Sequence, residues 1–335
     1  MGFPLNVLAS KLLALSWCSV VFATSLGSGS GWEQIPPMPT PRSDAGSVAL
    51  ADGTFLVIGG TEVAGAGTQI SGVLEQYLPN KDMWTKWNTS LPTPRANFGA
   101  ALYHNELYVI GGQAKETPGG SIGSVEILNL GTMKWRPGPT LPYSVMGHRV
   151  VTLPDETGIL VIGGFTYSKI YQRTDYHNES LVLDLRAGSE RWRKTKTSLP
   201  YRVSDFGVVV AKQANLIYAV GGAATYPGYA HVSVFDPKTE QWTRAGKLNV
   251  PRSYPACACI VEKSSGSEAI LVVGGMAGDF VPTNSVEIAN VVSGNSTLSF
   301  TAFDNFPVAR GAMAAGTVGT DVIVVGGTAA YMYKL

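Results

Sequence analysis

Five arginines recur at related places along this 335-residue chain, and their chemistry is typical of a binding site. They are Arg42, Arg95, Arg202, Arg252 and Arg310. A guanidinium group is planar and binds carboxylates, enolates or phosphates through two parallel hydrogen bonds. Aligning "LPYSVMG" with "LPYRVSDFG" puts Ser144 in the corresponding place, and Arg149, a few residues later, is not counted. The arginines predict a shared anion-binding face.

Polar residues of other types follow shortly after these places. They are Asp44, Asn97, Asp205 and Tyr254, with His148 near Ser144. Asp44, Asp205 and His148 are candidates for proton transfer, while the arginines would stabilise an oxyanion or an enolate. A carboxylate beside several arginines stays ionised, and it therefore suits a base better than an acid. The pattern predicts a ligand-binding mouth or a reaction that needs no cofactor.

A further candidate surface is the segment "FTYSKIYQRTDYHNES", residues 165–180. It contains Tyr167 and Arg173, and tyrosine and arginine are frequent anchors of binding surfaces. Loops on a rigid scaffold are where binding residues collect. The alternative is a solvated surface loop with incidental aromatic residues.

Cofactor and metal chemistry have little support in the sequence. There is no Gly-x-Ser-x-Gly elbow, P-loop or dinucleotide-binding glycine fingerprint. The four histidines are scattered, so we expect no metal site and no cofactor. The net charge of +1 comes without a basic cluster to neutralise phosphates, so we expect no nucleic-acid partner.

The elements that must position these residues are marked by a repeated pair of glycines. The pairs begin at Gly59, Gly111, Gly163, Gly221, Gly274 and Gly326, with spacings of 52, 52, 58, 53 and 52 residues. A period near fifty indicates a repeat architecture. A tryptophan follows four of the pairs, at Trp84, Trp135, Trp192 and Trp242, and we expect it to fill the contact between neighbouring units. Alternation and turn residues predict four antiparallel strands per unit and no helix.

The two ends of the chain complement each other. The sixth unit stops before any tryptophan, whereas Trp32 precedes the first glycine pair in "GWEQIPPMP". We expect this N-terminal strand to join the last unit, which closes a ring and removes open sheet edges. Strand parity then puts the arginines and the loops after the glycine pairs on one face, around a central channel.

The phrases "LYVIGG", "VSVFDPKTEQW" and "PTPR" resemble the kelch repeat across essentially all of residues 24–335. The resemblance implies an all-β fold, a six-bladed β-propeller with four antiparallel strands per blade. It also implies an alternative role for the arginines, which often tie kelch blades together through backbone carbonyls. Phe300 stands where the fifth unit should have its tryptophan, a variation that we expect the fold to tolerate. Copper radical oxidases share this propeller, but the scattered histidines do not favour a copper site.

The first residues indicate the compartment. Residues 1–23 form a largely apolar stretch ending in "VFA", which is typical of a signal peptide. The propeller of residues 24–335 is therefore expected to be secreted and monomeric, without a membrane anchor after cleavage. The sequons predict glycosylation at Asn88, Asn178 and Asn295. Cys257 and Cys259 lie two residues apart on a strand and cannot easily bridge.

Three hypotheses for the function stay open. The first is a secreted protein that binds a small organic molecule, with an isomerase-like, cyclase-like or intermediate-binding role in polyketide or other secondary-metabolite biosynthesis. It follows from a resemblance to stand-alone, signal-bearing kelch-like proteins of filamentous fungi. The second is an extracellular glycan- or protein-binding module, and the third is a sugar epimerase. A narrow mouth lined by Asp44, Arg95 and Asp205 would favour chemistry, and a broad aromatic surface would favour a partner.

Overall fold

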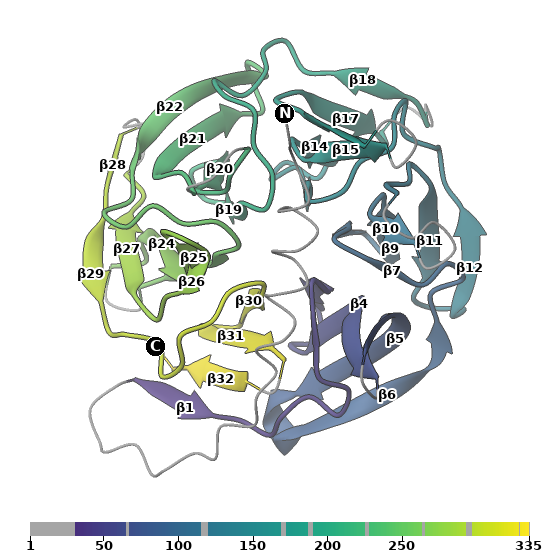
Figure 1. Ribbon diagram of the computed structural model, residues 1–335, viewed down its shortest axis with the longest axis horizontal. Coiled ribbons are helices and arrows are strands. Elements are labelled where there is room, and N and C mark those ends of the chain that lie inside the picture. Colours follow the sequence, from purple (N-terminus) through teal and green to yellow (C-terminus); the bar gives the residue numbers. More distant parts are fainter. Residues whose placement is uncertain are drawn as a thin grey trace.

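Six β-sheets of four or five strands surround a central axis in the computed structural model (Figure 1). The structure describes residues 31–64, 67–114, 120–168, 172–186, 190–224, 228–262, 265–292, 297–327 and 329–334. This arrangement confirms the predicted six-bladed β-propeller. Within these ranges the one helical element is the 3-10 turn Pro79–Lys81, and none is long and apolar enough to cross a membrane. The proposed signal peptide and Asn295 lie outside the described residues.

Each blade contains four strands, which follow one another from the axis outward. Blade I comprises β3 (Gly46–Ala49), β4 (Phe55–Ala64), β5 (Gly67–Leu78) and β6 (Met83–Ser90), and blade II comprises β8 (Gly99–Tyr103), β9 (Glu106–Ile110), β11 (Val125–Asn129) and β12 (Lys134–Pro137). Blade III comprises β13 (Arg149–Thr152), β14 (Gly158–Ile162), β17 (Ser180–Asp184) and β18 (Trp192–Lys194), and blade IV comprises β19 (Gly207–Ala211), β20 (Leu216–Val220), β21 (His231–Asp236) and β22 (Gln241–Lys247). Blade V comprises β23 (Ala256–Val261), β24 (Glu268–Val273), β27 (Val286–Asn290) and β29 (Thr301–Phe303).

Blade VI is built from both ends of the chain, as the sequence predicts. It contains β30 (Ala314–Val318), β31 (Asp321–Gly326), β32 (Ala329–Tyr333) and the N-terminal β1 (Trp32–Gln34), with Trp32 opposite Tyr333. The Trp32 ring packs against Phe306 and Tyr333. The ring of blades is therefore closed by antiparallel pairing between β1 and β32.

Tryptophans tie each blade to the one before it. The indole nitrogens of Trp84, Trp135, Trp192 and Trp242 donate to Pro36 O, Thr89 Oγ1, Pro139 O and Ser180 Oγ at 2.7–3.0 Å. Blade V has the buried Phe300 instead, which donates no such bond. There the short strand β28 (Leu298–Ser299) pairs in parallel with β22 of blade IV and joins the two blades. The hydrophobic core is divided in the same way, since each buried cluster is shared by neighbouring blades.

The glycine pairs bring the chain close to the crossover that enters the next blade. Gly112 N–H donates to Val145 O at 2.8 Å, and Gly111 has φ +64. A Cβ at Gly111 would lie 2.8 Å from that carbonyl oxygen, so only glycine fits without strain. Crossovers and post-glycine segments also pair directly: β7 (Arg95–Ala96) pairs with β10 (Gln113–Ala114), and β2 (Arg42–Ser43) pairs with the end of β4. They share one face of the propeller, as predicted.

Candidate functional site at the channel mouth

A ring of six equivalent residues surrounds the channel on the crossover face. The members of this mouth ring are Asp44, Asn97, Gly147, Asp205, Tyr254 and Ala312, all left-handed with φ between 53 and 65. Five backbone hydrogen bonds of 2.6–3.2 Å link them, each N–H donating to the carbonyl of the ring residue in the preceding blade. The left-handed conformation costs about 1–2 kcal/mol for a residue with a Cβ. The backbone here repeats in every blade, while the side chains differ.

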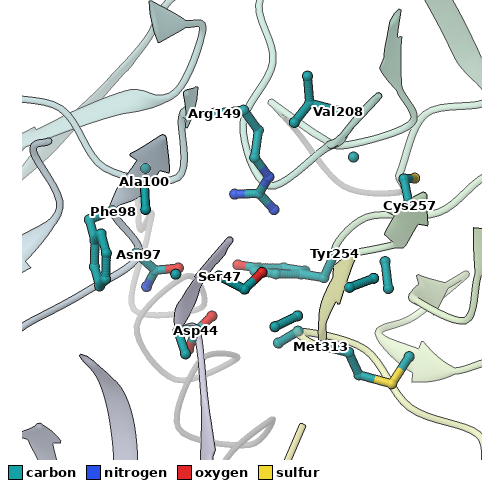
Figure 2. A pocket seen from close by; sticks show the side chains of 18 of the residues that line it. Asp44, Ser47, Asn97, Phe98, Ala100, Arg149, Val208, Tyr254, Cys257 and Met313 are labelled. Carbon is teal, nitrogen blue, oxygen red and sulfur yellow. The ribbon is translucent and has the colours of Figure 1, made fainter. Parts of the chain in front are cut away.

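The mouth ring opens into a cavity of about 150 Å³ that all six blades line. Polar side chains on its wall come from Asp44, Ser47, Asn97, Arg149 and Tyr254, and the remainder is mostly glycine, alanine and valine (Figure 2). Three residues singled out in the sequence, Asp44, Asn97 and Tyr254, are thus brought together from blades I, II and V. A cavity of this size accepts a small polar group rather than a drug-sized ligand, which occupies roughly 300–1,000 Å³.

Arg149 is the functional candidate that the sequence reasoning missed. Figure 2 shows its guanidinium directed into the channel, toward Tyr254. Nη1 donates to His148 O at 3.1 Å, and Cζ lies 5.8 Å from the centre of the Phe206 ring. Burial lowers the pKa of Arg149, and the nearby carboxylates of Asp205 and Asp44 oppose this effect.

A signal for Arg149 was present in the chain. It stands two residues after a mouth-ring residue, and the five other blades have glycine or alanine there: Gly46, Gly99, Gly207, Ala256 and Ala314. The strand register confirms this equivalence, because Arg149 pairs with Ile162, Gly99 with Ile110 and Gly207 with Val220. The sequence analysis missed this equivalence because it compared the arginine phrases, to which Arg149 does not belong.

Tyr254 and Asp205 are neighbours in the mouth ring, on blades V and IV. Tyr254 N–H donates to the Asp205 carbonyl oxygen at 2.6 Å, and Ser204 Oγ donates to Asp205 Oδ2 at 2.9 Å. Burial, followed by the charge of Asp205, raises the pKa of Tyr254 well above its usual value. Tyr254 is therefore neutral and can donate a hydrogen bond, and the Asp205 carboxylate accepts one from Ser204. The pair positions the tyrosine ring at the cavity.

His148 does not reach the mouth, which corrects its assignment to proton transfer. The side chain is fully buried and packs against Gly111 of blade II. Its Nε2 lies 3.0 Å from the Ile110 carbonyl oxygen, so this nitrogen carries the proton and donates it. Burial and the neighbouring Arg149 lower the pKa of His148 to about 3. A neutral imidazole sealed between two blades has a structural position.

Three of the five arginines are buried in the blades and do not line the cavity. Arg95 donates to Gly111 O and Ser124 O at 3.1 and 3.0 Å and pairs with Glu126 at 3.1 Å. The equivalent pairs are Arg252 with Glu287 at 2.7 Å and Arg42 with Glu75. For these arginines the geometry fits the structural alternative and corrects the ligand-binding interpretation. Of the three residues whose presence at a narrow mouth would favour chemistry, only Asp44 lines the cavity, and Arg95 and Asp205 do not.

The alignment of the third and fourth units also needs correction. The N–H groups of Gly112 and Gly164 donate to Val145 O and Val203 O, just as those of Gly222 and Gly275 donate to Arg252 O and Arg310 O. Val145 and Val203 therefore occupy the arginine position, in place of Ser144 and Arg202. Arg202 is exposed and donates to Tyr176 O at 3.1 Å. Arg310 is half-buried, and its buried Nε has no partner among the described residues.

Tyr167 and Arg173 belong to a hairpin on the crossover face of blade III. It is formed by β15 (Phe165–Ser168) and β16 (Arg173–Tyr176). Arg173 is exposed and pairs with Asp175 at 2.7 Å, and neither Tyr167 nor Arg173 lines the channel cavity. Their role in ligand binding stays a prediction for the rim.

The modifiable residues differ in accessibility. Asn88 is exposed on β6, whereas the Nδ2 of Asn178 donates to Leu199 O at 3.1 Å and is half-buried. Cys257 and Cys259 are free, and burial raises the pKa of both thiols to about 12, so neither is a thiolate at neutral pH. Among the described residues, no three His, Cys, Asp or Glu side chains gather in a group that could hold a metal ion.

Comparison with known proteins identifies a Kelch motif at residues 94–142. The Kelch repeat and BTB domain-containing protein 1 of horsepox virus is 23% identical over 253 residues, which cover 75% of this chain and 40% of that protein. Kelch-like protein 40a of Danio rerio is 31% identical over 125 residues, covering 37% of this chain and 20% of that protein. Human Kelch-like protein 34 is 24% identical over 255 residues, covering 73% and 36%. The chain spans less than half the length of each of these relatives.

Proposed function

Because the chain is a kelch-repeat propeller, a fold typically used as a binding module, we propose that it binds a small organic molecule at the mouth of its channel. The mouth ring carries this proposal. Its backbone recurs in all six blades, but Asp44, Asp205 and Tyr254 hold a conformation that glycine would adopt without strain. Strain retained at several residues around one cavity is typical of a functional site.

The cavity supports a ligand whose polar end enters the channel. Its wall combines acceptors on Asp44, donors on Arg149 and both on Asn97 and Ser47. Few precisely placed polar groups in an otherwise apolar wall are usual for small-molecule sites. We place the rest of the molecule on the crossover face, beside the hairpin that contains Tyr167 and Arg173.

A chemical role is the finer form of the proposal. Asp44 is the residue placed to accept a proton, since its carboxylate lines the cavity whereas His148 is sealed between blades and Asp205 does not line the cavity. The resemblance to secreted fungal kelch-like proteins supports an isomerase-like, cyclase-like or intermediate-binding role in secondary-metabolite biosynthesis. The propeller alone does not select among these roles.

The test is retention of metabolites by a protein whose cavity is filled. Ala315 lines the cavity from β30, so Ala315→Trp is designed to fill it. Lys212→Trp is the matched control, because Lys212 is exposed at the turn between β19 and β20. After incubation with a metabolite extract, native mass spectrometry should find a compound on the wild type and on Lys212→Trp, and not on Ala315→Trp. Identical spectra for all three proteins would count against the channel site.

A protein partner is a second candidate, favoured by one exposed apolar turn. Phe280, in the turn between β25 (Met276–Ala277) and β26 (Val281–Pro282), is 41% exposed, and Val281, the first residue of β26, is 61% exposed. Both follow the fifth glycine pair. This segment lies on the crossover face, since Met276 bridges to Ser253. A partner would use this turn together with the rim. Binding of a protein partner that is retained by Ala315→Trp and lost in Phe280→Ser would favour this second candidate.

A further inference from the structure

We infer that the molecule bound at the channel mouth presents a carboxylate and that Arg149 is the group that binds it. The inference rests on the proposed function and names the ligand chemistry of the same site. Two observations support it. Arg149 is a long cationic side chain at a place where the other blades have small residues, and no carboxylate of the described residues pairs directly with its guanidinium.

The channel has space around Arg149. At the equivalent place the other five blades contribute a glycine or an alanine, so none of them places a long side chain there. The guanidinium therefore reaches into the cavity of about 150 Å³ and forms part of its wall (Figure 2). A long side chain at a second blade would occupy the volume in which a ligand would lie.

The guanidinium is positioned but not neutralised by direct contact. It is fixed by the His148 carbonyl and by the Phe206 ring beneath it. No carboxylate oxygen of the described residues lies within 4.0 Å of its nitrogens, in contrast to the buried guanidiniums of Arg42, Arg95 and Arg252. Asp205, the largest favourable charge on Arg149, already accepts a hydrogen bond from Ser204. Nη1 donates to the His148 carbonyl, and the other side of the planar fork faces the cavity.

A carboxylate matches this arrangement in shape and charge. A guanidinium presents donors in a fork that fits two carboxylate oxygens, and the pair is strongest where water is excluded. Burial without a direct ion pair disfavours the charged form of Arg149, which is why its pKa is lowered. An incoming anion would remove this penalty. The cavity volume selects a small carboxylate over one carried by a bulky group.

The experiment measures binding of sodium glycolate and of its neutral amide, glycolamide, by saturation-transfer difference NMR. We expect glycolamide to bind the wild type at least ten times more weakly than glycolate. Arg149→Met should weaken glycolate binding at least tenfold, whereas Arg136→Met, which removes an exposed arginine paired with Glu106 on blade II, should leave it unchanged. Equal glycolate binding to wild type and Arg149→Met would overturn the inference.

Thermal unfolding gives a second measurement, because a structural role for Arg149 would shift the melting temperature of Arg149→Met in the opposite direction from a ligand-binding role. Removing a half-buried cation without a direct ion pair should raise the melting temperature of Arg149→Met. A lower melting temperature together with unchanged glycolate binding would assign Arg149 to structure and overturn the inference.

Two further probes separate the failure of this inference from failure of the proposed function. In one outcome, glycerol binds the wild type and not Ala315→Trp, while glycolate binds neither protein. The channel site would then stand, but its ligand would be neutral and the carboxylate inference would fail. An acidic peptide, acetyl-Gly-Asp-Gly-Asp-Gly-amide, that binds through Arg149 in preference to glycolate would overturn the small-molecule source of the carboxylate. If no probe binds and Ala315→Trp retains the same metabolites as the wild type, the proposed function itself fails.

Discussion

Blades I, II and V differ from blades III and IV in one buried pair of residues. In the first group an arginine of the crossover forms an ion pair with a glutamate on the third strand, as in Arg95 with Glu126. In blades III and IV both members are replaced. Val145 and Leu181 take their places in blade III, and Val203 and Ser233 take them in blade IV.

The comparison shows which repeated residues serve the scaffold. The glutamates also hold the crossover itself: Glu126 accepts from Thr93, and Glu287 accepts from the N–H groups of Asn249 and Val250. Blades III and IV lack this linkage, and they supply Arg149, Asp205 and the aromatic contacts of the rim. One contact is Tyr143 stacked on His177 at 4.7 Å. Residues that recur maintain the blade, and blade III, which departs from the repeat, contributes the cationic side chain of the cavity wall, Arg149.

Breaking one buried pair should have the largest effect. Glu287→Ala leaves the Arg252 guanidinium buried without its counter-charge, and we expect the free energy of unfolding to fall by about 3–5 kcal/mol. Urea denaturation measures this change. Arg202→Met, an exposed arginine outside the pair, should change the free energy of unfolding by less than about 0.5 kcal/mol. A similar loss in both variants would remove the distinction between the two kinds of arginine.

Converting blade V to the pattern of blade III should restore much of that loss. In Arg252→Val with Glu287→Leu both charges are absent, and replacement of a buried ion pair by apolar residues is often nearly neutral. We expect the double variant to be at least about 2 kcal/mol more stable than Glu287→Ala. A double-mutant cycle with the single variants measures the coupling. If the losses in the free energy of unfolding of the two single variants simply add in the double variant, the arginine and the glutamate do not act as a pair, and the pair does not distinguish the blades.

A smaller change in the free energy of unfolding is expected from His148, a residue of blade III that is buried against blade II rather than exposed at the mouth. Its pKa of about 3 lies below the unfolded value near 6.5, so between these pH values the unfolded chain binds a proton that the folded chain does not. The free energy of unfolding therefore falls as the pH drops through this window, by up to about 1.4 kcal/mol per pH unit. His177 and His231 also have lowered pKa values and act in the same direction.

Comparison with His148→Gln isolates this contribution, because the amide can still donate to Ile110 O. Between pH 6.5 and 4.5 the wild type should lose about 2 kcal/mol more than the variant in urea denaturation. Parallel losses would mean that His148 is protonated in the folded protein, and its position could then serve proton transfer after all.

The fold was predictable from the sequence in considerable detail. The spacing of the glycine pairs indicated six blades, and the surplus Trp32 at one end against the missing tryptophan at the other indicated the closure by β1. Asp44, Asn97 and Tyr254 were predicted to lie near one another because they follow equivalent phrases, and they do line one cavity. His148 was misplaced because it is the residue after a mouth-ring position, where the side chain points between blades.

By itself, then, the sequence determined the number of blades, the strand order, the ring closure and the face on which crossovers meet. These properties follow from periodic patterns, which a chain carries along its length. Only the tertiary structure decided that Arg95 is buried against Glu126 while Arg149 enters the channel. The direction of a side chain near the axis depends on its register against two neighbouring blades, and a shift of one residue along a strand turns it from the cavity into the core.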